Sequence, residues 1–482
     1  MKKIAIFIFV LFIPFFVFAQ ENSSDLENDL FGGDEDTLIS ADEARSDSKS
    51  NLKFKADLEK ASLSLESKKL RIGGSLSSSM GINYAWVDPY SKKDDYLKSF
   101  KDGKGTFNTT LNGSLFFDAR PNEDLKLYGK FLFGFPFEKS LSGALTVPKN
   151  SFGPLPPNDI ILPIGVNGAA NIKIQELYTD FSAKNIAFFR FGKHAVKWGT
   201  GYFYSPADVI NISRIDPQDP TADREGGISL RTHIIIPKTQ HNIWLYLLPP
   251  EQKDGFDPKY TAGAAKGEFV VGNWELGFGG WYKYEKAPRL ITTVSGSIAG
   301  KVAVFGEGVF AWGSDYTYYK ADMSSYTEKN KPFFQATLGG SYSNADTNTT
   351  IALQYFYNGF GYSNTDVSTS ILEKAEDPVS LSDASFRKKL QNVLAMGNRG
   401  QHYIALNISQ NKLGTDKLSL NLFQQFAISE LEGFSKLTLN WKIYKFASMS
   451  TGPSFSYPLS PSSKTKGQIG YSLSFRLGGG TF

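Results

Sequence analysis

The sequence predicts an all-β protein: a transmembrane antiparallel β-barrel of about 18 strands, with long external loops and short periplasmic turns. Apolar residues alternate with small or polar ones over unusually long segments, and the connections between these segments are alternately short and long. An export signal at the start is followed by no apolar run of 18 residues. Strands rather than helices are therefore expected to cross the membrane.

The chain begins with a segment typical of a secretory signal. Lys2 and Lys3 precede an apolar run from Ile4 to Phe18, and Val17-Phe18-Ala19 is a suitable cleavage site. We therefore expect residues 1–19 to be a signal peptide cleaved near Ala19, and the mature protein to reside in the outer membrane. A retained membrane anchor is the alternative.

The next segment, 20–50, differs in composition from the rest of the chain. It holds ten acidic and two basic residues, a net charge of −8, with few apolar residues. Such a composition favours a disordered tail, either a spacer or a docking segment for a periplasmic partner. Residues 51–69 are expected to be a periplasmic lead-in and 70–482 the barrel. Residues 51–482 together carry a net charge of +10.

The first expected strand shows the two-residue period most clearly. From Leu70 to Trp86 the even positions are mostly apolar, while the odd positions from Arg71 to Ala85 are small or polar. A soluble strand averages about five or six residues, and a sandwich would bury only the apolar face. A membrane barrel explains both faces, because one contacts lipid and the other a wet interior. Segments expected to be strands lie at 70–86, 105–119, 124–135, 171–182, 186–198, 226–237, 240–249, 260–271, 272–285, 288–299, 300–313, 331–343, 347–359, 401–411, 415–429, 433–447, 449–458 and 466–478.

Connection lengths between these segments agree with a barrel. Even-to-odd connections such as 183–185 are short, whereas 87–104, 136–170, 199–225, 314–330 and 360–400 are long. Sixteen strands is the alternative, because the segments at 288–299 and 449–458 are weakly patterned. The terminal Phe482, a candidate C-terminal signal for the barrel-assembly machinery, has the opposite parity to Phe475. Either the glycines at 478–480 form a bulge, or Phe475 is the effective signal.

Composition excludes several classes of function. The chain has no Cys and four His, which exclude disulfides and thiolate metal sites and make a His-rich site improbable. We find no nucleophile, metal-ligand or phosphate-loop motif. The expected protein is not an enzyme, needs no cofactor and binds no nucleic acid; its partners are outer-membrane lipid and small hydrophilic solutes.

Candidate pore residues gather around the fourth and fifth expected strands. Glu176, Tyr178 and Asp180 share one face, which we expect to point into the lumen. Arg190, Lys193 and Lys197 follow on the next strand. Strict alternation cannot place all three cations inside, so we expect a bulge at Gly192, because a cation facing lipid at mid-membrane would cost roughly 2–4 kcal/mol.

Two loops carry further candidates. The connection 199–225 holds Asp208, Arg214 and Arg224 and begins with the aromatic residues Tyr202, Phe203 and Tyr204. We expect it to fold inward as a constriction, with external decoration as the alternative. The 360–400 loop contains a helix from Ser382 to Met396, with Ser382 as N-cap and Gly397 as stop, that either lids the mouth or stabilises the loop.

The segment from Glu176 to Asn211 resembles large outer-membrane porin-type barrels and the capsule-assembly barrel. The residues concerned are Glu176 to Phe181, Arg190 to Lys193, Trp198 to Gly201 and Ser205 to Asn211. The resemblance implies the architecture and carries over no binding residue.

The predicted function is a porin-like channel for passive diffusion of small hydrophilic solutes, favouring anions because the barrel is cationic. The alternative is a non-conducting barrel that binds surface polysaccharide or another external ligand through Tyr202, Phe203 and Tyr204. Tyr316, Tyr318 and Tyr319 are further candidates for stacking, and both clusters could equally belong to the aromatic girdle.

Overall fold

The computed structural model describes residues 70–85, 103–122, 124–136, 171–183, 186–251, 255–375, 378–444, 446–460 and 467–481. The predicted signal peptide, acidic tail and lead-in, and Phe482, lie outside these residues and stay predictions. No helix among the described residues is long and apolar enough to span a membrane.

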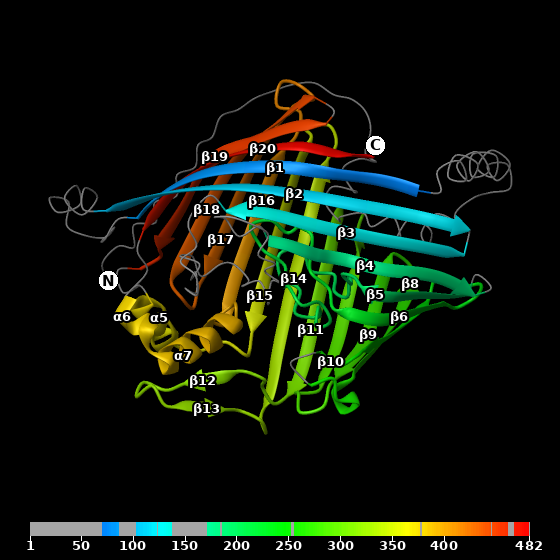
Figure 1. Cartoon of the computed structure of the whole chain (residues 1–482), viewed down its shortest axis with the longest axis horizontal. Helices are drawn as coiled ribbons and strands as arrows, with labels where there is room; N and C mark the ends of the chain where they lie inside the picture. Colours follow the sequence, from blue (N-terminus) through cyan, green and yellow to red (C-terminus); the bar gives the residue numbers. More distant parts are fainter. Residues whose placement is uncertain are drawn as a thin grey trace.

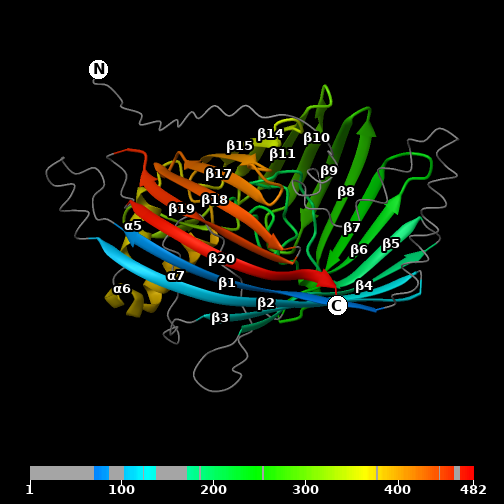
Figure 2. The same ribbon diagram turned by 90° about the horizontal axis from the view of Figure 1, so that it is seen from above.

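The described chain forms one closed 18-stranded antiparallel barrel (Figures 1 and 2). Each strand pairs with its neighbours in sequence, and β20 pairs with β1 to close the ring. The predicted number of strands is confirmed and the alternative of 16 is wrong, since both weakly patterned segments are barrel strands. The strands are β1 (Leu70–Ala85), β2 (Lys104–Asn122), β3 (Leu125–Pro136), β4 (Asn171–Ala183), β5 (Ala187–Lys193), β6 (Ile228–Ile235), β7 (Asn242–Leu248), β8 (Ala262–Val271), β9 (Trp274–Tyr282), β10 (Arg289–Ile298), β11 (Val302–Trp312), β14 (Pro332–Asn344), β15 (Thr349–Asn358), β16 (His402–Gln410), β17 (Leu418–Ala427), β18 (Glu432–Tyr444), β19 (Ala447–Pro458) and β20 (Gln468–Thr481).

Side chains alternate between the two faces of the wall. On β15, Ile351, Leu353 and Tyr355 are exposed on the outer face, whereas Gln354 and Phe356 are buried inside. The exposed aromatics Trp312 and Tyr444 are the last residues of β11 and β18, which end at opposite ends of the barrel, where membrane barrels carry aromatic girdles. The outer face is therefore suited to lipid, as expected of a transmembrane β-barrel.

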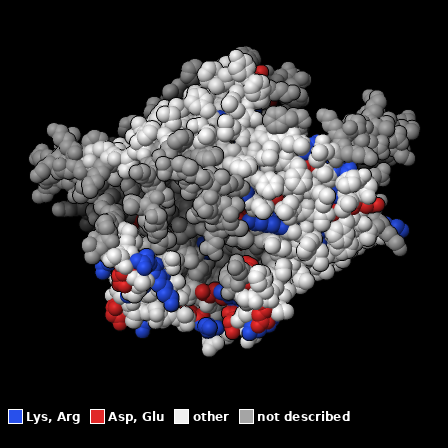
Figure 3. Space-filling view, viewed as in Figure 1, with Lys and Arg blue, Asp and Glu red and all other residues white. Residues whose placement is uncertain are grey.

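Long connections lie at one end of the barrel and short turns at the other. Figure 3 shows Lys, Arg, Asp and Glu gathered mainly at the end that carries the helices, below a largely uncharged wall. Short turns include 272–273 after β8 and 299–301 after β10. Because outer-membrane barrels have short periplasmic turns, the helical end is the external one.

The closure of the barrel contains the bulge expected near the C-terminus. Gly74 pairs with Gly480 but Ser75 pairs with Gly478, so Gly479 is the additional residue. Gly478 has a φ of +103°, and a Cβ at this position would lie 2.4 Å from the carbonyl oxygen of Gly74. A residue other than glycine would therefore force the two strands apart.

Two external connections pack together as a cap, defined here as the described residues of 313–331 and 359–401. It contains the hairpin β12 (Thr317–Tyr319) and β13 (Ser325–Thr327) and the helices α5 (Asp366–Lys374), α6 (Pro378–Ser382) and α7 (Ala384–Ala395). Its core includes Tyr319, Ile371 and Leu390. The predicted helix exists, but Asp383 rather than Ser382 is its N-cap, accepting from the backbone N–H of Ser385.

Candidate functional site

The segment 194–227 leaves the barrel wall and enters the interior; we call it the inward loop. Strand β5 ends at Lys193, so the prediction that it continues to residue 198 is wrong. At the departure point Glu176 on β4 accepts a hydrogen bond of 3.2 Å from the backbone N–H of Ala195. The prediction that this connection folds inward is confirmed by its contacts with inward-facing wall residues.

The predicted bulge at Gly192 is wrong. The β4–β5 ladder continues without a register shift to the pair Leu177 and Lys193, and the nearby shift lies in the β3–β4 ladder, between Lys130 and Phe131. Gly192 instead has a φ of +129°, and a Cβ there would lie 2.3 Å from the carbonyl oxygen of Leu177. Because the chain leaves the wall two residues later, strand alternation no longer governs where Lys197 points.

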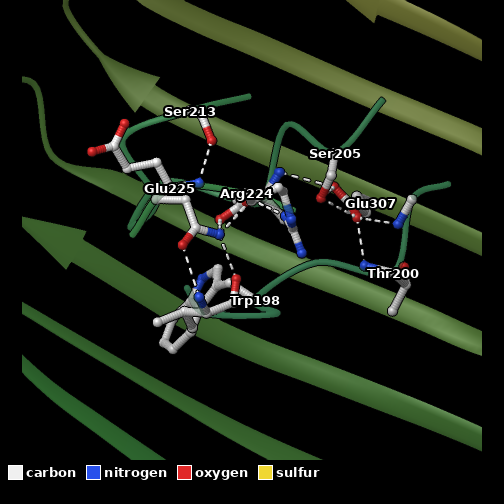
Figure 4. Close-up of polar contacts among 12 residues, drawn as sticks. Trp198, Thr200, Ser205, Ser213, Arg224, Glu225 and Glu307 are labelled. Carbon is white, nitrogen blue, oxygen red and sulfur yellow. Dashed lines mark hydrogen bonds and ion pairs between the residues drawn. The ribbon is translucent and has the colours of Figure 1, made fainter. Parts of the chain in front are cut away.

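A buried carboxylate on the wall anchors the start of the inward loop (Figure 4). Glu307 of β11 accepts hydrogen bonds from the backbone N–H groups of Thr200 (2.6 Å), Gly201 (2.5 Å) and Ala207 (2.8 Å), and from the Ser205 hydroxyl (2.9 Å). A Cβ on Gly199 would lie 2.3 Å from the same carboxylate, so the Trp-Gly-x-Gly sequence leaves the room that Glu307 fills.

Three more wall side chains hold the same loop. Gln354 on β15 accepts from the backbone N–H of Phe203 (2.7 Å) and donates to the carbonyl of Tyr204 (2.6 Å). Gln425 on β17 donates to the Tyr204 hydroxyl at 2.7 Å, and Lys266 on β8 donates to the carbonyl of Trp198 at 2.9 Å. Each bond satisfies a backbone or side-chain group that burial would otherwise leave unpaired.

Apolar packing fastens the loop to one half of the interior. Trp198 lies in a cluster with Tyr246 and Ile291, and Phe203 and Tyr204 lie in a second cluster with Phe356. Burying such a side chain is worth about 1.5–3 kcal/mol. We call the inward faces of β7–β11 and β14–β17, with the loop on them, the packed half.

The burial of these aromatics changes their expected role. Phe203 and Tyr204 are 1% and 4% exposed, and Tyr318 and Tyr319 are buried in the cap. Tyr202 packs against the same cluster as Phe203. Because Phe203, Tyr204, Tyr318 and Tyr319 are buried, they do not form an exposed stacking surface on the outside of the protein and do not belong to an aromatic girdle.

The inward faces of β19, β20 and β1–β5 form the polar half of the interior. Small hydroxyl side chains bridge neighbouring strands: Ser75 with Ser114 at 2.8 Å, and Ser450 with Ser474 at 2.6 Å. Side chains this small reach only the neighbouring strand, so they cannot fill the wide lumen of an 18-stranded barrel.

The polar half contains the predicted residues of β4 and β5. Asp180 pairs with Arg190 through two hydrogen bonds of 2.6 and 2.9 Å, and the guanidinium lies 4.0 Å from the ring centre of Tyr178. Tyr178 also contacts Tyr128 of β3, with ring centres 5.1 Å apart. The prediction that Glu176 and Asp180 share the interior face is confirmed.

Carboxylates in the polar half are shared by several cations. Asp118 on β2 lies within 4 Å of Arg71, Arg120 and Lys126. Glu225, at the end of the inward loop, contacts Lys173 at 2.6 Å and Lys193 at 2.7 Å. Partial burial alone would raise the pKa of Glu225, but hydrogen bonds from the two lysines outweigh it and lower the pKa below its ordinary value.

The remaining predicted loop residues occupy two places. Asp208 is buried and pairs with Arg224, and the Asn211 amide donates to both its oxygens at 2.9 Å. Burial nonetheless raises the pKa of Asp208, against the opposing effect of Arg224.

Arg214 lies apart from this pair: it donates to the Tyr316 hydroxyl at 2.5 Å and to the carbonyls of Ala395 and Met396 at the end of α7. Lys197 is exposed, and its positive charge interacts with the carboxylate of Glu275 on β9.

Sequence reasoning missed the residues that hold the loop. Glu307, Gln354, Gln425 and Lys266 all occupy inward positions. A large polar residue on an inward position is the available signal. The loop partners of these four residues lie 68 to 221 residues away in the chain, and strand alternation carries no information about such pairings.

Among the described residues there is no group of three or more His, Asp or Glu that could hold a metal ion. No protein-family model matches the sequence, and no curated protein matches it.

Solved structures similar to the chain include three proteins from Pseudomonas aeruginosa. OpdK, solved with vanillate, is 8% identical, with 86% of this chain and 99% of that chain covered and a TM-score of 0.47. OccK8 (OprE) is 9% identical, with 85% and 98% covered and a TM-score of 0.46. The outer membrane protein OprD is 7% identical, with 86% and 94% covered and a TM-score of 0.46.

Proposed function

We propose that the protein is an outer-membrane channel for passive diffusion of small hydrophilic solutes, with a preference for anions. The observation that carries the proposal is the unequal lining of the interior. The inward loop is fastened to one half by Glu307 and Gln354, whereas the other half bears hydroxyl groups and partly exposed cations. Water and solute would pass along the polar half.

The charges of the polar half support the anion preference. Asp118 is 4% exposed and shared by three cations, while the side chains of Lys126 and Arg71 are 19% and 28% exposed. Lys130 is 17% exposed and bonds to Asp223 of the inward loop at 2.5 Å. Around Asp118 the cations are therefore more exposed to the lumen than the carboxylate that they share, and positive charge at a constriction favours anions.

Planar-bilayer recordings of the purified protein test the proposal. We expect discrete ion-conducting steps. In a KCl gradient, we expect a reversal potential shifted from zero toward the equilibrium potential of chloride. Absence of conducting steps would remove the channel, and a potential of the opposite sign would remove the anion preference. Glycan-array binding without conductance would support the alternative, a non-conducting barrel that binds surface polysaccharide.

The acidic segment 20–50 gives the proposal a second test. Its net charge is opposite to that of the barrel, so it could lie against the cationic lumen or bind a periplasmic partner. Recordings with and without residues 21–50 distinguish these uses. Higher conductance after removal indicates that the segment enters the lumen, and equal traces indicate a spacer or a partner-binding segment.

A further inference from the structure

A small polar cavity lies at the external mouth, between the inward loop and the cap. Its volume is about 120 Å³, room for roughly four waters at ~30 Å³ each. The lining includes Tyr204 and Asp208 from the inward loop, Arg289 and Gln335 from the wall, and Tyr316 from the cap. Arg214 reaches the same cavity from the inward loop. Three parts of the chain that are distant in sequence therefore meet around one space.

The cavity is lined by more positive than negative charge. The recorded hydrogen-bond partners of Arg214 are uncharged: the Tyr316 hydroxyl and the carbonyls of Ala395 and Met396. Asp208, the carboxylate in the lining, is already neutralised by Arg224. Among the described residues, the guanidinium of Arg214 thus has no carboxylate partner within 4 Å.

Arg289 contributes the second guanidinium group in the lining of the cavity. Its Nη2 donates to Asp315 at 3.1 Å, and its guanidinium lies 5.2 Å from the ring centre of Trp281. Its Nε is buried and has no hydrogen-bond partner among the described residues. An atom this buried is closed off from the cavity, so the part of Arg289 that lines the cavity is the rest of its side chain.

We propose that this cavity binds a small inorganic oxyanion, such as phosphate, between Arg214 and Arg289. Guanidinium groups match oxyanions because their planar N–H donors form paired, charge-assisted hydrogen bonds. The bound anion accepts hydrogen bonds from the guanidinium groups that line the cavity and supplies the negative charge that Arg214 lacks. It also joins the inward loop to the wall and the cap, so anion binding stiffens the mouth. The site binds whether or not the lumen conducts.

Titration of the purified full-length protein with inorganic phosphate, followed by ³¹P NMR line broadening and by isothermal calorimetry, tests the site. We expect saturable binding of one phosphate per chain. Arg289→Gln is expected to weaken binding by about tenfold or more, since it removes charge-assisted hydrogen bonds. Arg289→Lys keeps the charge but loses the planar fork, so its affinity should fall between those of the other two proteins.

The matched control is Lys301→Gln, which removes a positive charge from the exposed periplasmic turn between β10 and β11, at the opposite end of the barrel. It should bind phosphate as the unsubstituted protein does. Two results would overturn the proposal: phosphate binding that does not saturate, or equal affinity of Arg289→Gln and the unsubstituted protein. If a lysophospholipid binds with saturation and inorganic phosphate does not, the site is assigned to a lipid phosphate instead.

Discussion

The packed half and the polar half of the interior are built by the same alternation and differ in what stands on the inward positions. On β15 these positions carry Gln354 and Phe356, which are large enough to contact the inward loop. On β1 they carry Ser75, Ser77 and Ser79, which reach no further than the neighbouring strand. The size of the inward side chains therefore decides which half of a wide barrel is filled.

Charge is handled differently in the two halves as well. The carboxylate of Glu307 is buried and surrounded by N–H and O–H donors of the loop, so it acts as an anchor. Asp118 of the polar half is surrounded by cations whose side chains are partly exposed. One buried carboxylate fastens backbone, and the other holds a cationic surface in place.

The largest effect should follow from Glu307→Ala in the packed half. It leaves three backbone N–H groups and the Ser205 hydroxyl without their acceptor, each orphaned donor costing about 1–3 kcal/mol until water reaches it. We expect the loop to detach with a loss of more than about 3 kcal/mol. Single-channel conductance should rise and limited proteolysis should cleave within 194–227.

Glu307→Gln keeps one acceptor oxygen and should give a smaller change, and Glu373→Ala on the exposed surface of α5 should give none. A fully protected loop in Glu307→Ala would show that apolar packing alone holds it.

The next effect concerns the polar half. Reversing both Lys126→Glu and Lys130→Glu changes the energy of an anion about 4 Å away by roughly 2 kcal/mol for each residue, even in a watery lumen. We expect the anion-to-cation permeability ratio to fall by more than about tenfold, as measured by the reversal potential in a salt gradient. Lys417→Glu, on an exposed periplasmic turn, is the control. An unchanged potential in the double variant would place the conducting path elsewhere.

A pH effect should follow from Glu225, which joins the two halves. Its pKa is lowered by Lys173 and Lys193, so these contacts stabilise the fold above the ordinary value of 4.5 and are lost as the pH falls through the lowered pKa. We expect proteolysis at the end of the inward loop to increase only in this acid range. Glu225→Gln should show the same increase at pH 7, with no further change on acidification. An acid response that persists in Glu225→Gln would assign it to another group.

The smallest effect is expected from Tyr204→Phe. The substitution removes one hydrogen bond from Gln425 and retains the ring contacts with Phe356, so the expected loss is about 1 kcal/mol. Urea unfolding of the refolded barrel would measure it. Tyr282→Phe, on the exposed outer face, is the matched control and should change nothing. A loss of several kcal/mol would mean that the hydroxyl organises more of the packed half than its one bond indicates.

Much of the barrel was predictable because its signal is local. The even positions from Leu70 onward lie outside and the odd positions inside, and the same period located each of the 18 strands to within a few residues. The bulge at the C-terminal glycines followed from parity alone. Prediction failed where the chain leaves the wall: β5 ends at Lys193 instead of residue 198, because the backbone turns at Gly192 and then bonds to Glu176.

The candidate site was predicted only in part, for the same reason. Glu176, Asp180 and Arg190 are neighbours on paired strands, so alternation and pairing brought them together. The ion pair of Asp208 with Arg224 and the hydrogen bonds of Arg214 with the end of α7 depend on loops that follow no period. Among the described residues, loop contacts such as these set the shape of the mouth.

By itself the sequence determined the strand number, the two faces of the wall and the excess of positive charge on residues 51–482, because each depends on residue type and spacing. Only the tertiary structure decided that Glu307 and Gln354 hold the inward loop, that Phe203 and Tyr204 are buried, and that Arg214 and Arg289 share a cavity. These contacts join residues far apart in the chain. Their partners are fixed by the closed curvature of the barrel, which no local pattern encodes.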